Sequence, residues 1–179
     1  MSAFNALEFR SKLKYGGLRP NLFQVKLNIP DSNGASEDFS FKCESSNTPA
    51  FVTGYADTYY FGRRVSWPAD REWADWTVTV IADEDFNVRA ALEAWQDRCS
   101  RTDWSAEMLE QDKGLNLFSD ASILEFGKDG TVLREVQMFN AFPIMIGPLE
   151  HSWSSNNQIS RFTVDFRYDY CRPSQPTKT

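Results

Sequence analysis

Apolar and polar side chains alternate most regularly near the C-terminal end of the chain, after a polar turn at residues 153–160. A two-residue period predicts an antiparallel strand that buries one face and exposes the other. The inward face of this predicted strand consists of Phe162, Val164, Phe166, Tyr168 and Tyr170. The outward face consists of Arg161, Thr163, Asp165, Arg167 and Asp169. We expect the strand to close the domain, with its outward face against water or a partner.

Other segments with the same period predict further strands. Residues 22–29 and 39–44 alternate in this way and are expected to pair as a hairpin. Residues 51–67 are rich in aromatic side chains and are expected to form one long or bent strand. Gly54 and Gly62 are the expected bulges or bends of that strand, because glycine inside a strand pattern marks such positions.

A strand at residues 73–81 is predicted to lead directly into the one well-defined helix. Apolar residues then recur at helical spacing, and Asp83 or Asp85 is expected to cap the helix. The apolar stripe of this helix consists of Val88, Ala91, Leu92, Trp95 and Cys99. Residues 102–119 have mixed character, which predicts a loop.

Residues 123–126 and 131–142 flank a Gly-Lys-Asp-Gly turn, which predicts a second hairpin. Its return strand is expected to end from Pro143 onward, since proline removes a backbone donor. Together these segments predict a mainly β fold, an antiparallel sandwich or rolled barrel of about seven strands with one flanking α-helix.

The predicted elements divide the chain into three parts. Residues 1–18 are expected to form an N-terminal arm with a short helix, which Gly16 and Gly17 end. Residues 19–170 form the domain. Residues 171–179 are polar and contain proline, so we expect a mobile tail.

Charge and cysteine content exclude several classes of function. The 179 residues carry 19 Lys and Arg against 25 Asp and Glu, a formal charge of −6, so tight nonspecific binding to phosphate backbones is not expected. Three cysteines far apart in sequence argue against a disulfide framework or a zinc knuckle. There is no apolar run of roughly 20 residues and no secretory signal pattern, so we expect synthesis in the cytosol and no membrane segment.

Candidate catalytic chemistry is sparse in this sequence. The acidic run at residues 83–85 suggests a metal site or an acid/base pair, but it is also the normal start of a helix. His151 is the only histidine, and no nucleophile motif accompanies it. We therefore expect no catalytic residue, cofactor or metal. Two other classes stay open: a monomeric barrel that binds an apolar or sugar ligand through its aromatic residues, and an enzyme that uses the carboxylates near Asp83.

Four segments, in this order and spacing, resemble the tail tube proteins of contractile-tailed bacteriophages. They are Arg-Pro-Asn-Leu-Phe-Gln-Val at 19–25, Phe-Ser-Phe-Lys-Cys at 39–43 with Thr-Pro-Ala at 48–50, the run from 70 to 80, and the run from 153 to 170. The loop at residues 31–38 and the tail after Tyr170 look longer than the core of that family needs.

The resemblance implies a structural, non-enzymatic protein. Members of this family form six-membered rings with a continuous inner β-barrel, and the rings stack into a tube inside a contractile sheath. The implied partners are other copies of the chain and the sheath, tape-measure, baseplate and tube-terminator proteins, with double-stranded DNA passing through the bore without specific binding. The implied location is the virion, after assembly in the host cytoplasm. A baseplate tube initiator and a type VI secretion ring protein share the fold and stay as alternatives.

A ring of this kind is wide enough to be a conduit. Six subunits giving four strands each, at ~4.8 Å spacing and ~40° tilt, close a barrel with an open bore of roughly 40 Å. By analogy with the family, the residues expected to line the bore are Ser40, Lys42, Glu44, Asp57, Glu125, Glu135 and Gln137. An ordinary solvated face is the alternative for each of them. The residues expected at contacts between subunits are Arg19, Asn21, Arg63, Arg64, Asn156, Asn157, Arg161, Asp165, Arg167 and Asp169.

Overall fold

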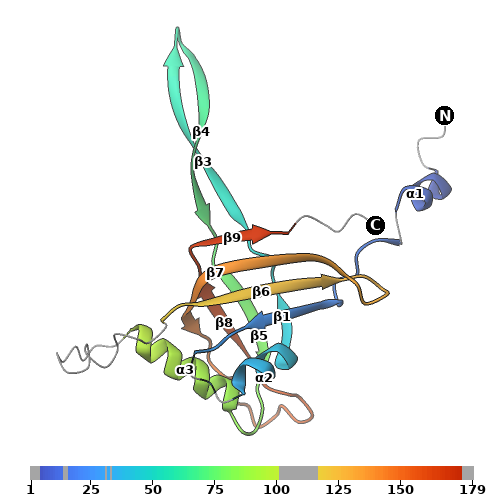
Figure 1. The fold of residues 1–179 in the computed structure, drawn as a ribbon, viewed down its shortest axis with the longest axis vertical. Coiled ribbons are helices and arrows are strands. Elements are labelled where there is room, and N and C mark those ends of the chain that lie inside the picture. The colour runs from blue at the N-terminus through green and yellow to red at the C-terminus, as the bar shows by residue number, and fades with distance from the viewer. Residues whose placement is uncertain (1–4, 14–15, 31, 33, 101–116, 175–179) are drawn as a thin grey trace.

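The computed structural model describes residues 5–13, 16–30, 32, 34–100 and 117–174, and these residues form nine strands and three helices (Figure 1). The strands are β1 (Phe23–Leu27), β2 (Cys43–Ser46), β3 (Phe51–Tyr60), β4 (Arg63–Trp73), β5 (Trp76–Ile81), β6 (Ser119–Phe126), β7 (Val132–Ile146), β8 (Arg161–Arg167) and β9 (Tyr170–Pro173). The helices are α1 (Ala6–Lys12), α2 (Ala35–Lys42) and α3 (Asn87–Cys99). The prediction of a mainly β, antiparallel fold is confirmed.

One long strand joins the two halves of the main sheet. The strand order is β1-β6-β7-β8-β5-β2, all antiparallel, with β9 paired to β7. The first part of β7 pairs with β6 and β9, and the last part pairs with β8. Asn140 lies at the register shift just before the β8-paired part, with φ 56°, a conformation that asparagine tolerates better than most residues. The sheet therefore folds over at β7 and encloses the core.

The core lies between the folded sheet and two helices. Phe166 of β8 is fully buried, and its ring centroid lies 5.1 Å from that of Trp76, 6.1 Å from that of Trp95 and 6.3 Å from that of Phe39. These partners come from β5, α3 and α2, so one aromatic cluster ties the sheet to both helices. The inward faces predicted for β8 and for the α3 stripe are confirmed at Phe162, Val164, Phe166, Tyr168, Val88, Leu92 and Trp95.

The segment expected to be one bent strand is a separate hairpin. Strands β3 and β4 pair only with each other as a sheet and project from the body (Figure 1). Phe61 and Gly62 form the turn, with φ of 46° and 76°, the positive values that a two-residue hairpin turn needs. Gly54 is a bulge, as predicted, where the register shifts between Thr53 and Tyr55. A side chain there would come within 3.1 Å of the Asp70 carbonyl oxygen.

The strand predicted at residues 39–44 is wrong. The chain forms α2 up to Lys42 and only then extends into β2, which pairs with β5. Phe39 is fully buried while Phe41 is 84% exposed, so the two phenylalanines do not share a face as a strand would require. Ala35 and Phe39 are the buried residues of α2, four positions apart. A spacing of four residues fits one face of a helix as well as one face of a strand, so the pattern did not separate the two. The expected hairpin with residues 22–29 is also wrong, because β1 pairs with β6.

Several predicted boundaries also differ. Helix α3 begins after Phe86, whose side chain makes no cap hydrogen bond. Asp83 accepts from the Glu84 N–H in the preceding turn, whereas Asp85 accepts from the backbone N–H of Asn87, the first residue of the helix. Strand β7 continues through Pro143, with a register shift between Pro143 and Met145, and ends at Ile146. Residues 101–116, which include most of the predicted 102–119 loop, lie outside the described residues.

The C-terminal segment does not continue as a single strand. The chain turns after Arg167, and β9 pairs with β7, so residues 171–173 belong to the sheet edge and the expected mobile tail is wrong for them. Tyr170 is 37% exposed and stacks on Phe139 with ring centroids 4.7 Å apart, which corrects its predicted place in the core.

Candidate functional site

The β3–β4 hairpin carries the largest set of exposed aromatic side chains. Tyr59, Tyr60 and Phe61, at its end, are 74%, 71% and 89% exposed. Further down the hairpin, Tyr55 and Trp67 are 71% and 59% exposed. Two paired strands without a core are marginally stable in water, and contiguous exposed apolar surface marks interaction sites. The hairpin therefore has the character of a contact element for another protein surface.

An aromatic cluster fixes the base of the hairpin to the body. The Arg71 guanidinium lies 4.4 Å from the Phe51 ring centroid and 5.3 Å from that of Trp73. The Trp73 ring in turn lies 6.1 Å from that of Tyr168, the residue that follows β8. Cation–π and aromatic contacts of this kind hold a defined geometry. The direction in which the hairpin projects is thus set by the core.

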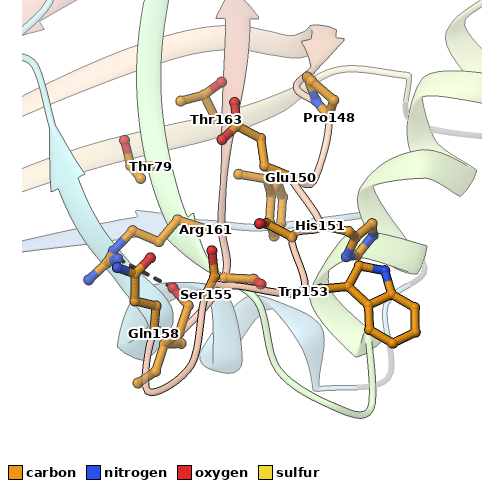
Figure 2. Close-up of a pocket in the computed structure, with 13 residues that line it drawn as sticks. Thr79, Pro148, Glu150, His151, Trp153, Ser155, Gln158, Arg161 and Thr163 are labelled. Atoms are coloured by element: carbon orange, nitrogen blue, oxygen red, sulfur yellow. Dashed lines mark hydrogen bonds between the residues drawn. The ribbon is translucent and has the colours of Figure 1, made fainter.

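A pocket of about 730 Å³ lies under the loop that joins β7 to β8 (Figure 2). Trp153 at its edge is fully exposed, and Ile159 is 63% exposed. Glu150 and Arg161 supply opposite charges to the lining. In Figure 1 this loop lies at the end of the molecule opposite the projecting hairpin. Neither this pocket nor a separate hairpin at residues 51–73 was predicted from the sequence.

The sequence does contain a signal for the turn of the β3–β4 hairpin. Gly62 lies between aromatic residues and an arginine pair, and a glycine flanked by two alternating segments is a hairpin signal. The pocket had no comparable signal, because its lining joins residues from β5, β8 and the β7–β8 loop.

All four charged residues expected on the outer face of the last strand have partners within the subunit. Arg161 forms an ion pair with Glu44, and Arg167 Nη1 lies 2.7 Å from Asp75 Oδ1. Asp165 accepts from the Thr77 hydroxyl at 2.6 Å, and Asp169 accepts from the Asn140 amide at 2.6 Å. These four residues are at least partly exposed, so contact with a neighbour is still a prediction, but intramolecular pairing already explains their charges.

The other expected contact residues lie apart from β8. Arg63 and Arg64 follow the hairpin turn, and Arg64 lies 3.7 Å from Asp57. Arg19 lines a second, smaller pocket before β1, and Asn21 is exposed beside it. Asn156 and Asn157 lie in the β7–β8 loop, and Asn157 has φ 64°, as expected for a turn.

The structure gathers three of the seven expected bore residues. Ser40, Glu135 and Gln137 line one groove of about 660 Å³ between α2 and the β1–β6–β7 face. Their common surface also includes Gln24 and Lys26, on the outer side of β1.

The other four expected bore residues lie elsewhere. Glu125 pairs with Phe23 and Arg134, on the opposite side of the sheet from Glu135. Lys42 and Glu44 form ion pairs with other segments, and Asp57 lies on the hairpin.

The acidic segment before α3 surrounds a lysine. Lys42 Nζ lies 2.9 Å from Asp83, 3.5 Å from Asp38 and 3.9 Å from Asp85. The hydrogen bond from Lys42 is the main reason that the pKa of Asp83 lies below its usual value. The same contact raises the pKa of Lys42. A cation already occupies the middle of the cluster, so the carboxylates tie α2 to the β5–α3 turn.

The pKa shift of Asp83 predicts an acid-dependent contribution to stability. A carboxyl group with a lowered pKa in the folded state stabilises the fold above its unfolded pKa of about 3.9, and this contribution is lost as pH falls through the folded value. Asp83→Asn should therefore lower the urea midpoint at pH 7, and the difference from the parent protein should vanish in strong acid. Glu84→Gln is the control, and an equal Asp83→Asn effect at all pH values would contradict the assignment.

Other candidate chemistry finds little support in the described part of the chain. No group of three or more histidine, cysteine or acidic side chains in it is placed to hold a metal ion. Burial raises the pKa of the Cys43 thiol to about 12, which makes it a poor nucleophile. His151 lines the exposed β7–β8 loop pocket. None of the described helices is both long and apolar enough to cross a bilayer.

Solved structures with this fold come from contractile injection systems. The anti-feeding prophage tube-terminating cap matches with a TM-score of 0.65 at 15% identity, over 90% of this chain and 93% of the other. A chain of the sheath-tube complex of the extracellular contractile injection system PVC matches with a TM-score of 0.54 at 13% identity, over 96% of this chain and 99% of that chain. At these sequence identities the structural similarity shows a shared fold.

Sequence comparisons show the family. The family model described as phage tail tube protein matches residues 18–172. The tail tube protein gp19 of Enterobacteria phage T4 is 30% identical over 153 residues, which cover 85% of this chain and 89% of that protein. The resemblance inferred from the sequence is thereby confirmed. The chain belongs to the phage tail tube protein family, and its function is that of a tail tube protein of contractile phages.

Proposed function

We propose that this protein assembles into six-membered rings that stack into the inner tube of a contractile tail. The observation that carries the proposal is the β3–β4 hairpin, a two-stranded sheet with exposed aromatic side chains along its length. In a lone subunit this surface favours aggregation, whereas in a tube a neighbouring subunit covers it. Extended at about 3.3 Å per residue, a strand of ten residues reaches roughly 33 Å, far enough to contact another ring.

Open sheet edges support closure of a ring. In the main sheet, β1 pairs only with β6 and β2 pairs only with β5. Unpaired edges invite addition of a strand from a neighbour, and a closed ring satisfies all of them at once. The ring would place the polar outer face of the β1–β6–β7 sheet around the bore, with Glu135 and Gln137 among the lining residues. Polar and acidic groups hold DNA weakly, which suits passage through a conduit.

The partners and location follow from the tube role. The sheath, tape-measure, baseplate and terminator proteins would contact the tube, and DNA would pass along it. The similarity to a chain of a sheath-tube complex supports the contact with the sheath. The similarity to a tube-terminating cap supports the contact with a terminator protein at the end of the tube. We place the protein in the virion tail, assembled in the host cytoplasm, as a structural protein that catalyses no reaction.

Electron microscopy of the purified protein tests the proposal. We expect rings with sixfold symmetry and, at high concentration or on added baseplates, tubes with an open bore of roughly 40 Å. A protein that stays monomeric under all of these conditions would favour the alternative of a ligand-binding barrel, especially if a stoichiometric small molecule co-purified with it.

A baseplate tube initiator is a second candidate function with the same fold. The two roles differ in copy number, because a repeated tube subunit far outnumbers an initiator. The similarity to the T4 tail tube protein favours the repeated subunit. Quantitative mass spectrometry of purified particles should therefore find this chain in large excess over the baseplate proteins.

A further inference from the structure

The subunit has two uncovered aromatic surfaces at opposite ends. One is the hairpin tip, defined as residues 59–63, and the other is the loop pocket, defined as the pocket under residues 148–163 (Figures 1 and 2). At the tip, Phe61 is 89% exposed, and at the pocket Trp153 is fully exposed. The direction of the hairpin is fixed at its base by Arg71 and Trp73, so the two surfaces face away from each other.

The tip has the shape of a preformed knob. The rings of Tyr60 and Phe61 meet edge to face, with centroids 4.6 Å apart and an interplanar angle of 88°. Rings held in this way lose little conformational freedom on binding. The loop pocket, at about 730 Å³, falls within the range of ~300–1,000 Å³ that accepts ligands much larger than one aromatic ring. Its volume is thus large enough for the two rings of the knob.

The charges of the two surfaces are complementary. Arg63 follows the knob and forms no ion pair with any residue that the structure describes. Glu150 lines the pocket and likewise has no ion-pair partner among the described residues. Arg64, the arginine next to the tip, is already near Asp57, and the other charged residue of the pocket, Arg161, is paired with Glu44. One unpaired cation at one end thus corresponds to one unpaired anion at the other.

We propose that the loop pocket is the docking site for the hairpin tip of a second copy of this chain in the next ring. In this contact Tyr60 and Phe61 fill the pocket, Trp153 and Ile159 cover them, and Arg63 pairs with Glu150. The two surfaces are different patches at opposite ends, so the contact is heterologous and does not close on itself. Repeated from ring to ring, it builds a linear stack with a fixed polarity. The inference rests on the proposed function for the existence of stacked rings.

Charge reversal at the two predicted partners tests the contact. Arg63→Glu and Glu150→Arg should each reduce the sedimentable tube fraction by about tenfold or more while rings still form, because each places like charges together. The double variant restores the opposite charges, so it should recover most of the tube fraction. Arg64→Glu is the matched control on the hairpin. Because Arg64 is not the predicted partner of Glu150, combining Arg64→Glu with Glu150→Arg should not restore the tube fraction. Trp153→Ala is an independent variant: its side chain is fully exposed in the subunit, so folding should be unchanged while stacking is weakened.

The outcomes separate this contact from the proposed function. Single variants that form tubes as readily as the parent protein would overturn the docking site and leave the tube role intact. A double variant no better than the worse single variant would also overturn it. If the parent protein itself formed neither rings nor tubes on baseplates, the proposed function would fail, and the docking site with it.

Discussion

Phe166→Ala is expected to lower the free energy of unfolding of the subunit by about 3–5 kcal/mol, the usual cost of removing a fully buried phenylalanine. The ring contacts Trp76, Trp95 and Phe39, which belong to β5, α3 and α2. Its loss leaves a cavity at the point where the sheet meets both helices, and three large rigid rings cannot easily close that space. A loss of this size is a large share of the 5–15 kcal/mol that stabilises a typical domain.

Urea denaturation at a low, fixed protein concentration measures this effect without the contribution of assembly. Phe41→Ala is the matched control, since Phe41 is the same residue type on α2 but is 84% exposed. We expect the control to change the free energy of unfolding by less than about 0.5 kcal/mol. Similar losses for both variants would contradict the assigned core.

Excision of the hairpin is the second large effect that we expect. Joining Thr53 to Arg71 through an Asn-Gly turn removes the projecting part and keeps the opposed pair at its base. The remaining body should keep its urea midpoint, because the removed residues contribute nothing to the buried core. Tube formation should be abolished, as measured by sedimentation and electron microscopy, since the uncovered aromatic surface is gone.

Phe61→Asn separates the shape of the hairpin from its aromatic surface. Phe61 has φ 46°, and asparagine before Gly62 suits this turn better than phenylalanine does. The variant should keep the hairpin and weaken tube formation only in part. Normal tubes from the excised variant would show that the hairpin is dispensable for assembly.

The elements that the sequence predicted correctly are those whose burial is one-sided. Strand β8 alternates without exception from Phe162 to Phe166, and α3 keeps its stripe from Val88 to Trp95, so a single period describes each. A core that covers one face imposes such a pattern on the chain. The turn at Gly127–Gly130 was equally predictable, because its residues allow the required backbone angles.

The elements that were predicted wrongly do not have one face on the core and the other in solvent. Residues 35–42 contain two phenylalanines, but only Phe39 is buried, so the strand period there was accidental. The hairpin from Phe51 to Trp73 is apolar on surfaces that no core covers, so its pattern did not reveal that it leaves the body. The ion-pair partners of the charged residues on the outer face of β8 could not be predicted from the sequence either. Arg167 and Asp75 meet only because β8 inserts beside β5, far away in the sequence.

The strand order also sets the time at which the subunit can complete its fold. Strand β5 is made early, yet its neighbour β8 is among the last segments to leave the ribosome, and β1 likewise waits for β6. At about 5–20 residues per second, β5 spends several seconds of synthesis without that partner. Phe166, at the centre of the core, arrives with β8. A nascent chain therefore cannot complete its core before β8 is made, so the proposed ring assembly would be restricted to completed chains.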